Sequence, residues 1–305
     1  MINQRYLVPE RSDEEVNSPS KFNGQDDLKE TRISQSNSEL EETLERNGMS
    51  GSGKKFSDEC IFKYCLGGLD ERANILKDLA LSASDQDIAE FAQQVSLYSA
   101  CSHHWSQIAI TKKLIRDGTR VWNLMSQHNE HVPWENVGFE IQKQFMEIAN
   151  TTRSLSDQDL SFLRRVSGCQ GYFSHENFEK MWSWLYPVAF TLSRSWITPL
   201  WGSTSPNWIE GFITKEEAER SLQGARGLQQ PGTFILRFPT SRSWPHPDAG
   251  NLVVTYIGSD CTLHHRLISL DYIHRSARDK NAKSLQDLIL NEPELSRLGR
   301  VIRGQ

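Results

Sequence analysis

The sequence predicts an α+β protein in which a helical linker domain precedes a small module with a central antiparallel sheet flanked by two helices. Three observations predict this class. Apolar residues recur at helical spacing from about residue 56 to 198, β-rich runs begin only after Pro199, and turn-forming residues separate those runs. Hydrophobic residues make up 37% and charged residues 24%, a composition that excludes fibrous and membrane proteins.

Residues 1–55 form an acidic arm that we expect to be disordered. Tyr6 and Phe22 are its only aromatic residues, so it has little apolar area with which to offset the entropy lost on ordering. Gly48–Lys55 is close to a phosphate-binding P-loop, but Lys55 stands where Ser or Thr would hold magnesium, and no strand precedes it. A flexible linker is the better interpretation.

Two helical segments follow the arm: residues 56–130, whose identity the sequence leaves open, and residues 131–207. Ser84 and Ser156 each precede a first turn rich in Asp, which is typical of a helix N-cap. We therefore expect helices to begin at both serines.

Residues 208–305 predict the α+β module. Three runs have strand character and two have helical spacing: strands at 233–238, 252–257 and 262–268, helices at 215–222 and 284–290. Because the connections between the strands are short, we expect the strands to lie in sequential order.

Arg237 is expected in a poorly solvated place, because both faces of its strand are largely apolar. A buried cation needs a partner, and the nearest acidic residues along the chain are Asp248 and Glu219. Two interpretations stay open. One is a structural ion pair with one of these residues, and the other is a socket for a dianionic phosphate, which the rigid fork of arginine donors fits.

Several groups could complete such a socket, because they are cationic or carry hydrogen-bond donors and lie near Arg237 in a sequentially ordered sheet. They are Lys215, Thr240, Ser241, Arg242 and His264.

Nothing in the sequence predicts an enzyme, a metal site or a cofactor. Cys60 and Cys65 with His103 and His104 lack the spacing of a zinc site. The five cysteines are odd in number and scattered, which indicates free thiols. There is no signal peptide and no run of 18 apolar residues, so we expect a cytoplasmic or nuclear protein without a membrane partner.

Ordered blocks of the module resemble a Src-homology-2 (SH2) domain. They are Trp208, Gly211–Ile213, Lys215, Ala218–Glu219, Pro231–Phe238 and Ser241, with Thr262–Ile268 similar to the fourth strand and Ser284–Ile289 similar to the start of the second helix. The forms Gly211–Glu216 and Phe234–Phe238 most resemble the signal transducer and activator of transcription (STAT) family. Residues 131–207 resemble its helical linker, and the best match is the plant STAT-type linker–SH2 proteins.

The resemblance implies an adaptor or transcription-related regulator that docks tyrosine-phosphorylated proteins. Arg237 would grip the phosphate, and Lys215 and Ser241 would be its pocket partners. His264 would line the same pocket, and His265 would shape the site for residues after the phosphotyrosine.

The sequence also departs from the family. Pro239 replaces a polar pocket residue, and Trp244–Asp248 extend the following loop so that it could cover or crowd the pocket. These departures motivate an alternative, a STAT-like regulatory scaffold that no longer depends on phosphate. Residues 56–130 lack the strands of a DNA-binding barrel and the net charge is −5, so direct DNA binding gains little support. Tyr272, the last tyrosine, lies inside the module, so we do not expect a reciprocal tail-exchange dimer.

Overall fold

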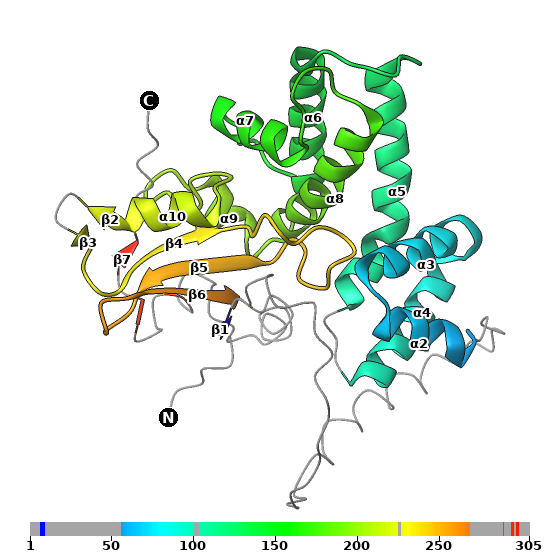
Figure 1. The fold of residues 1–305 in the computed structure, drawn as a ribbon, viewed down its shortest axis with the longest axis horizontal. Helices are drawn as coiled ribbons and strands as arrows, with labels where there is room; N and C mark the ends of the chain where they lie inside the picture. Colours follow the sequence, from blue (N-terminus) through cyan, green and yellow to red (C-terminus); the bar gives the residue numbers. More distant parts are fainter. Residues whose placement is uncertain are drawn as a thin grey trace, which may run out of the picture. The chain divides into compact units, whose positions relative to one another are not determined.

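The computed structural model describes residues 7–9, 56–100, 104–224, 227–268, 289, 294–295 and 297–298. Figure 1 labels the helices, which are α2 (Asp58–Leu66), α3 (Leu69–Ser82), α4 (Asp85–Ser99), α5 (Trp105–Ser126), α6 (Trp134–Ala149), α7 (Asp157–Val166), α8 (His175–Leu192), α9 (Thr198–Gly202) and α10 (Lys215–Leu222). The predicted helix over 215–222 is confirmed by α10. No helix in the described part of the chain is both long and apolar enough to cross a membrane.

The two predicted N-caps are confirmed, because α4 and α7 each begin with a capping box. The Ser84 side chain accepts from the N–H of Asp87, and the Asp87 carboxylate accepts from the N–H of Ser84. Ser156 and Asp159 repeat this arrangement. Each box satisfies backbone donors that the first turn leaves without an intrahelical partner.

Helix α5 joins the two predicted helical segments, because it packs on α3 and α4 and also on α6 and α8. The indole Nε1 of Trp182 in α8 donates to the carbonyl of Leu114 at 3.0 Å. A Cβ at Gly118 would lie only 2.8 Å from the same Nε1, so this close approach requires glycine. One hydrophobic cluster extends from Ile61 in α2 to Ile268 in the sheet. The cluster includes residues on both sides of the domain boundaries predicted at residues 130 and 207. Those boundaries therefore stay predictions.

The main sheet has the strand order β1-β6-β5-β4-β7, and a short hairpin of β2 (Gln223–Gly224) and β3 (Gly227–Leu228) lies apart from it. Strands β4 (Thr233–Arg237), β5 (Leu252–Ile257) and β6 (Leu263–Ile268) confirm the three predicted runs and their sequential, antiparallel order. β7 (Arg297–Leu298) pairs in parallel with β4, so the sheet is not wholly antiparallel.

Strand β1 (Leu7–Pro9) pairs with β6, so the prediction of disorder is wrong for these three residues. The physical reason is that an edge strand offers unpaired backbone groups, and any extended segment can pair with them whatever its composition. The rest of the predicted arm and nearly all of the predicted helix over 284–290 lie outside the described residues.

The strand register divides the sheet side chains between two faces. The first, which we call the α10 face, carries Ile235 and Ile257, which pack against α10, together with Arg237, Thr255 and His265. In Figure 1 helix α10 lies over β4 and β5 on this side.

The second, which we call the opposite face, carries Phe234, Leu236, Val254 and Tyr256, and these belong to the large hydrophobic cluster of the helical region.

Candidate functional site

Arg237 lies at the centre of the α10 face and only 1% of its surface is exposed. Every residue of β4 is buried, because β5 and β7 flank the strand and α10 packs on the face that Arg237 occupies. The guanidinium Nε donates to the hydroxyl of Thr255 at 3.0 Å. The prediction of a poorly solvated guanidinium is therefore confirmed.

The Thr255 hydroxyl connects Arg237 to a second pair of groups. Its Oγ1 lies 3.0 Å from Nδ1 of His265, and Nε2 of His265 lies 2.9 Å from a carboxylate oxygen of Glu219 in α10. A hydroxyl that accepts from Arg237 and donates to Nδ1 leaves the imidazole hydrogen on Nε2, where it is donated to Glu219. One hydrogen-bonded chain thus links three strands and the helix that covers them.

Both acidic residues that the sequence offers as partners of Arg237 bind other groups. Asp248 forms an ion pair with Arg242, and Glu219 binds His265. Arg242 is buried in this pair, so the structure gives it a role in holding the β4–β5 loop (residues 238–251) together. This pairing does not support the predicted role of Arg242 in the phosphate pocket, which stays a prediction.

Lys215 and Glu216, in the first turn of α10, are further charged residues near Arg237. The pKa of the Glu216 carboxyl is lowered, chiefly by a hydrogen bond with its own backbone and one with the Thr214 side chain, and further by the charges of Arg237 and Lys215. Both cations therefore act on the same carboxylate, and the predicted pocket role of Lys215 stays a prediction. Lys215 itself is exposed.

The β4–β5 loop turns toward the helical region. The carbonyl of Pro239 accepts from the indole of Trp184 at 2.9 Å, and the N–H of Trp244 donates to the carbonyl of Ser183 at 2.8 Å. The buried Trp244 indole donates to the Thr111 hydroxyl at 3.2 Å. The extension around Trp244 therefore docks on α5 and α8, and its contacts do not support the expectation that it covers the pocket.

The first residues of the loop remain accessible. Ser241 is exposed and Thr240 is partly buried, so both hydroxyls can be reached from solvent. Their predicted roles as phosphate ligands stay predictions.

The strand register places the two histidines on different faces of the sheet, and their predicted binding roles stay predictions. His265 is opposite Thr255 and so lies on the α10 face, whereas His264 is opposite Tyr256 and lies on the other face. His264 stacks on the Tyr256 ring with centroids 5.2 Å apart, and its Nε2 lies 3.0 Å from the Asp260 carboxylate. His265, not His264, is therefore the histidine linked to Arg237.

Sequence reasoning missed two residues of the site, Thr255 and Glu216. Thr255 and Tyr256 are the two hydroxyl-bearing side chains of β5, and a threonine hydroxyl in this largely apolar run is the signal that could have found Thr255. Glu216 follows Lys215 in a helix start rich in acidic residues, so its position could be predicted but not its proximity to Arg237.

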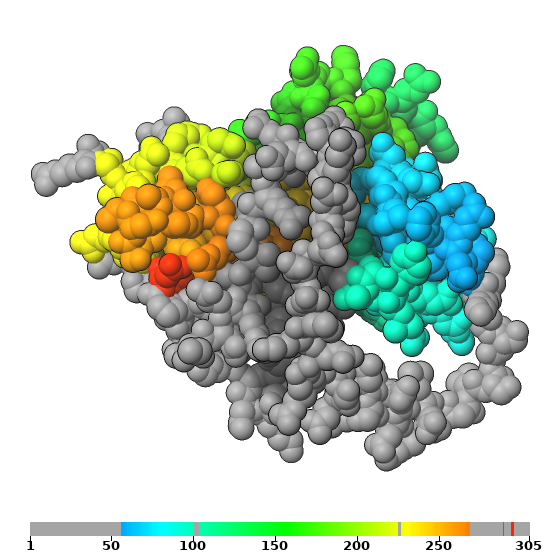
Figure 2. All heavy atoms as spheres, turned by 60° about the horizontal axis from the view of Figure 1, so that its bottom comes forward, coloured from blue at the N-terminus to red at the C-terminus, as the bar shows by residue number. Residues whose placement is uncertain are grey.

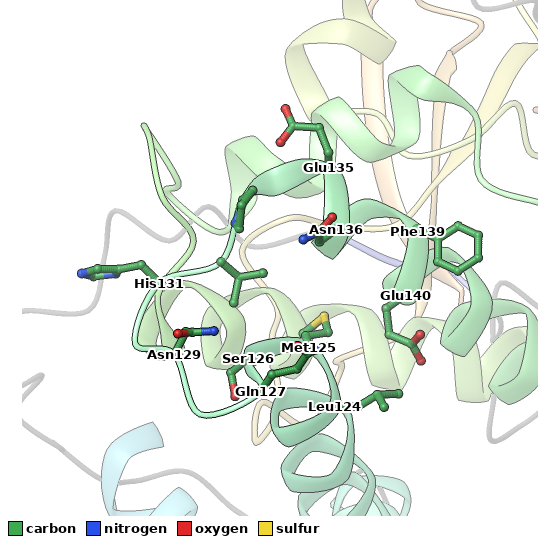
Figure 3. A pocket seen from close by; sticks show the side chains of 12 residues that line it. Leu124, Met125, Ser126, Gln127, Asn129, His131, Glu135, Asn136, Phe139 and Glu140 are labelled. Atoms are coloured by element: carbon green, nitrogen blue, oxygen red, sulfur yellow. The ribbon is translucent and has the colours of Figure 1, made fainter.

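Two pockets of the described chain lie in the helical region. One, of about 410 Å³, lies where α5 ends and α6 begins, and Figure 3 shows Met125 and Asn136 beside this space. The other, of about 460 Å³, lies between α4 and α5. Arg237 lines neither of them.

Helix α10 brings charged residues to an arginine that is buried on an interior strand of the sheet, and β4, β5 and β6 are antiparallel and in sequential order. This arrangement defines an SH2-like module, which here follows a helical region. Comparison with known proteins agrees with this class. SH2 domain-containing protein A of Arabidopsis thaliana is 56% identical over 271 residues, which cover 88% of this chain and 42% of that protein. SH2 domain-containing protein B of the same organism is 58% identical over 249 residues, covering 81% of this chain and 37% of the relative.

A more distant match is signal transducer and activator of transcription B of Dictyostelium discoideum, 27% identical over 136 residues, which cover 42% of this chain and 11% of that protein. No family model matches the chain. The chain spans about two fifths of the length of the two Arabidopsis relatives. These similarities support a STAT-related SH2 domain protein, as the sequence motifs predicted.

Proposed function

We propose that this protein is a signalling adaptor or transcription-related regulator that docks tyrosine-phosphorylated proteins through the α10 face. The observation that carries the proposal is the burial of Arg237 on β4, an interior strand, where its Nε donates to Thr255 beside the first turn of α10. A phosphate dianion carries acceptor oxygens whose geometry matches the donor fork of a guanidinium. The kinship with SH2 proteins and a STAT protein supports the same class of function.

Recognition of this kind acts as a switch. A peptide without phosphate offers no charge to Arg237, whereas the phosphopeptide forms a charge-assisted pair in a poorly solvated place. Lys215 adds a second cation from the start of α10, and Ser241 adds a hydroxyl from the β4–β5 loop. The protein would thus act by binding and not by turnover of a substrate, in the cytoplasm or the nucleus.

The test is fluorescence polarisation with a phosphotyrosine peptide library and its unphosphorylated twin, on the whole chain and on Arg237→Ala. We expect selective binding of the phosphorylated set and a loss of about 2–5 kcal/mol in the variant, roughly one to four decades in affinity.

Arg266→Ala is the matched control, because Arg266 lies on the opposite face and pairs with Glu294 at 3.1 Å. This variant should keep its affinity for the phosphopeptide. Equal binding of phosphorylated and unphosphorylated peptides by all three proteins would exclude the phosphotyrosine mechanism.

A second candidate is a regulatory scaffold that binds its partner without phosphate. The contact of the Pro239 carbonyl with Trp184 and the pairing of Arg242 with Asp248 favour it, because both take loop groups away from a phosphate pocket. A partner segment bound equally well by Arg237→Ala would identify this function.

A further inference from the structure

The pocket of about 460 Å³ between α4 and α5 has no part in the proposed phosphotyrosine site. It lies in residues 56–130, the region whose identity the sequence left open. In Figure 2 the helices of this region form the blue and cyan surface. A pocket of this size is in the range that proteins use for ligands and for anchoring side chains of a partner.

The floor of the pocket is apolar and made largely of small residues. Its members are Ile88, Ala89 and Ala92 in α4 and Ala109 in α5. Ala89 and Ala109 are exposed, so within the described residues no large side chain covers these two alanines. Small residues at a helix surface let another helix approach closely and pack its side chains between theirs.

Asp85 at the start of α4 and one face of α5 form the rest of the pocket. Trp105, Lys112, Lys113 and Arg116 line it, and their spacing of seven, eight and eleven residues from Trp105 places them on the same side of the helix. Trp105 is 43% exposed, which is unusual for so large an apolar side chain. The pocket thus has an aromatic end and a cationic end.

The surroundings of Asp85 show that the three cations lie near one another. Its carboxylate binds the Lys112 ammonium at 2.9 Å, and its pKa is lowered by that hydrogen bond and by the charges of Lys112, Lys113 and Arg116. A second carboxylate, that of Asp117, pairs with Arg116 at 3.3 Å, so two carboxylates offset part of three positive charges. Carboxylates of a bound partner would enter the same positive field.

We propose that this groove binds an acidic amphipathic helix of a partner protein. Its apolar side chains would pack over Ala89 and Ala109, with a bulky one beside Trp105, and its carboxylates would face Lys113 and Arg116. The apolar floor favours a peptide over a nucleic acid, because duplex DNA is held by many phosphate contacts along a basic surface. Only three basic side chains line this pocket.

The test measures fluorescence polarisation of a labelled, designed helix about 18 residues long with leucines on one face and glutamates on the other. Two twins accompany it, one with the same composition in scrambled order and one with lysines in place of the glutamates. We expect the whole chain to bind the first helix and to bind each twin about tenfold or more weakly.

Two variants locate the site. Lys113→Glu combined with Arg116→Glu reverses the charge of the rim, and Ala109→Gln fills the floor without a change in charge; each should weaken binding about tenfold. Lys143→Glu on α6 is the control for charge alone and should leave binding unchanged, because Lys143 is exposed and does not line the pocket. Thermal unfolding of each variant verifies that it folds.

Several results would overturn the proposal. Equal binding of the scrambled twin would show non-specific attraction of acidic peptides. Unchanged binding in the charge-reversed and Ala109→Gln variants would place the peptide elsewhere on the protein. A DNA duplex that displaces the helix and is itself unaffected by Ala109→Gln would show that the cations serve nucleic acid.

Discussion

The two faces of the sheet are built from alternate residues of the same three strands, yet they do different things. The opposite face carries Phe234, Leu236 and Tyr256 into the hydrophobic cluster of the helical region. The α10 face keeps Arg237, Thr255 and His265 in one hydrogen-bonded chain. Apolar burial favours folding, whereas buried polar groups contribute little net stability even when they are paired.

The comparison teaches that stability and recognition are separable in this module. Phe212 joins the helical region to the module. The centroid of its ring lies 5.0 Å from that of Trp184 and 6.4 Å from that of Phe238. Its N–H also donates to the Asp159 carboxylate at 2.7 Å. Substitutions in this cluster should change unfolding, and substitutions on the α10 face should change binding.

Phe212→Ala should have the largest effect on stability. Phe212 is 3% exposed, and its loss would leave a cavity among aromatic rings, so we expect the free energy of unfolding to fall by about 3–5 kcal/mol. Urea denaturation measures this change. Phe139→Ala is the matched control, because Phe139 is 73% exposed and should change stability by less than about 0.5 kcal/mol. Similar losses in both variants would contradict the assignment of Phe212 to the core.

Thr255→Val removes the hydroxyl that links Arg237 to His265 with almost no change in shape. A buried guanidinium Nε then loses a bond, and we expect a cost of about 1–3 kcal/mol in unfolding free energy and weaker phosphopeptide binding.

Thr233→Val is the control for Thr255→Val. Its hydroxyl, in the same sheet, donates only to the Gln230 carbonyl at 2.7 Å. Thr233→Val should lower the free energy of unfolding by about 0.5–1.5 kcal/mol and leave the affinity for the phosphopeptide unchanged. Equal affinities of Thr255→Val and Thr233→Val would show that the link to His265 does not support binding.

Glu216→Gln tests how a charge on the α10 face affects phosphopeptide binding. The Glu216 carboxylate acts on the same cations that a phosphate would meet, so removing its charge should tighten phosphopeptide binding by roughly three- to tenfold. Because the pKa of Glu216 lies below its ordinary value of 4.5, the carboxylate stays ionised from about pH 8 down to 5. The ratio of wild-type to variant affinity should therefore be constant from about pH 8 to 7, where the phosphate is a dianion as well, and a ratio that changes strongly within that range would contradict this account.

The smallest effect is expected at Asp260, beside the other face. Hydrogen bonds from His264 and Thr262 lower its pKa from 3.8 to about 2 in the folded protein. A group whose pKa is depressed by folding contributes stability above its unfolded pKa and loses it as the pH falls through the folded value. The difference in stability between wild type and Asp260→Asn should thus be full near neutral pH and disappear between about pH 4 and 2. Urea denaturation over this range measures it, and a difference that persists at the lowest pH would contradict it.

Local chemistry allowed much of the fold to be predicted from the sequence. The serine caps at 84 and 156 depend on a residue and its neighbour three positions later, and the strands over 233–257 depend on β-branched and aromatic runs. The burial of Arg237 was predictable for the same reason, since its flanking residues in the strand are apolar. These interactions span only a few residues of the chain.

Only the tertiary structure decided which side chains meet Arg237. A shift of one residue in the register between β5 and β6 would exchange His264 for His265, and the sequence of either strand alone does not fix that register. The docking of Trp244 on Thr111 joins residues 133 positions apart, and the pairing of Leu7–Pro9 with β6 joins the two ends of the sequence. Such contacts depend on the packing of the whole core, which no local pattern specifies.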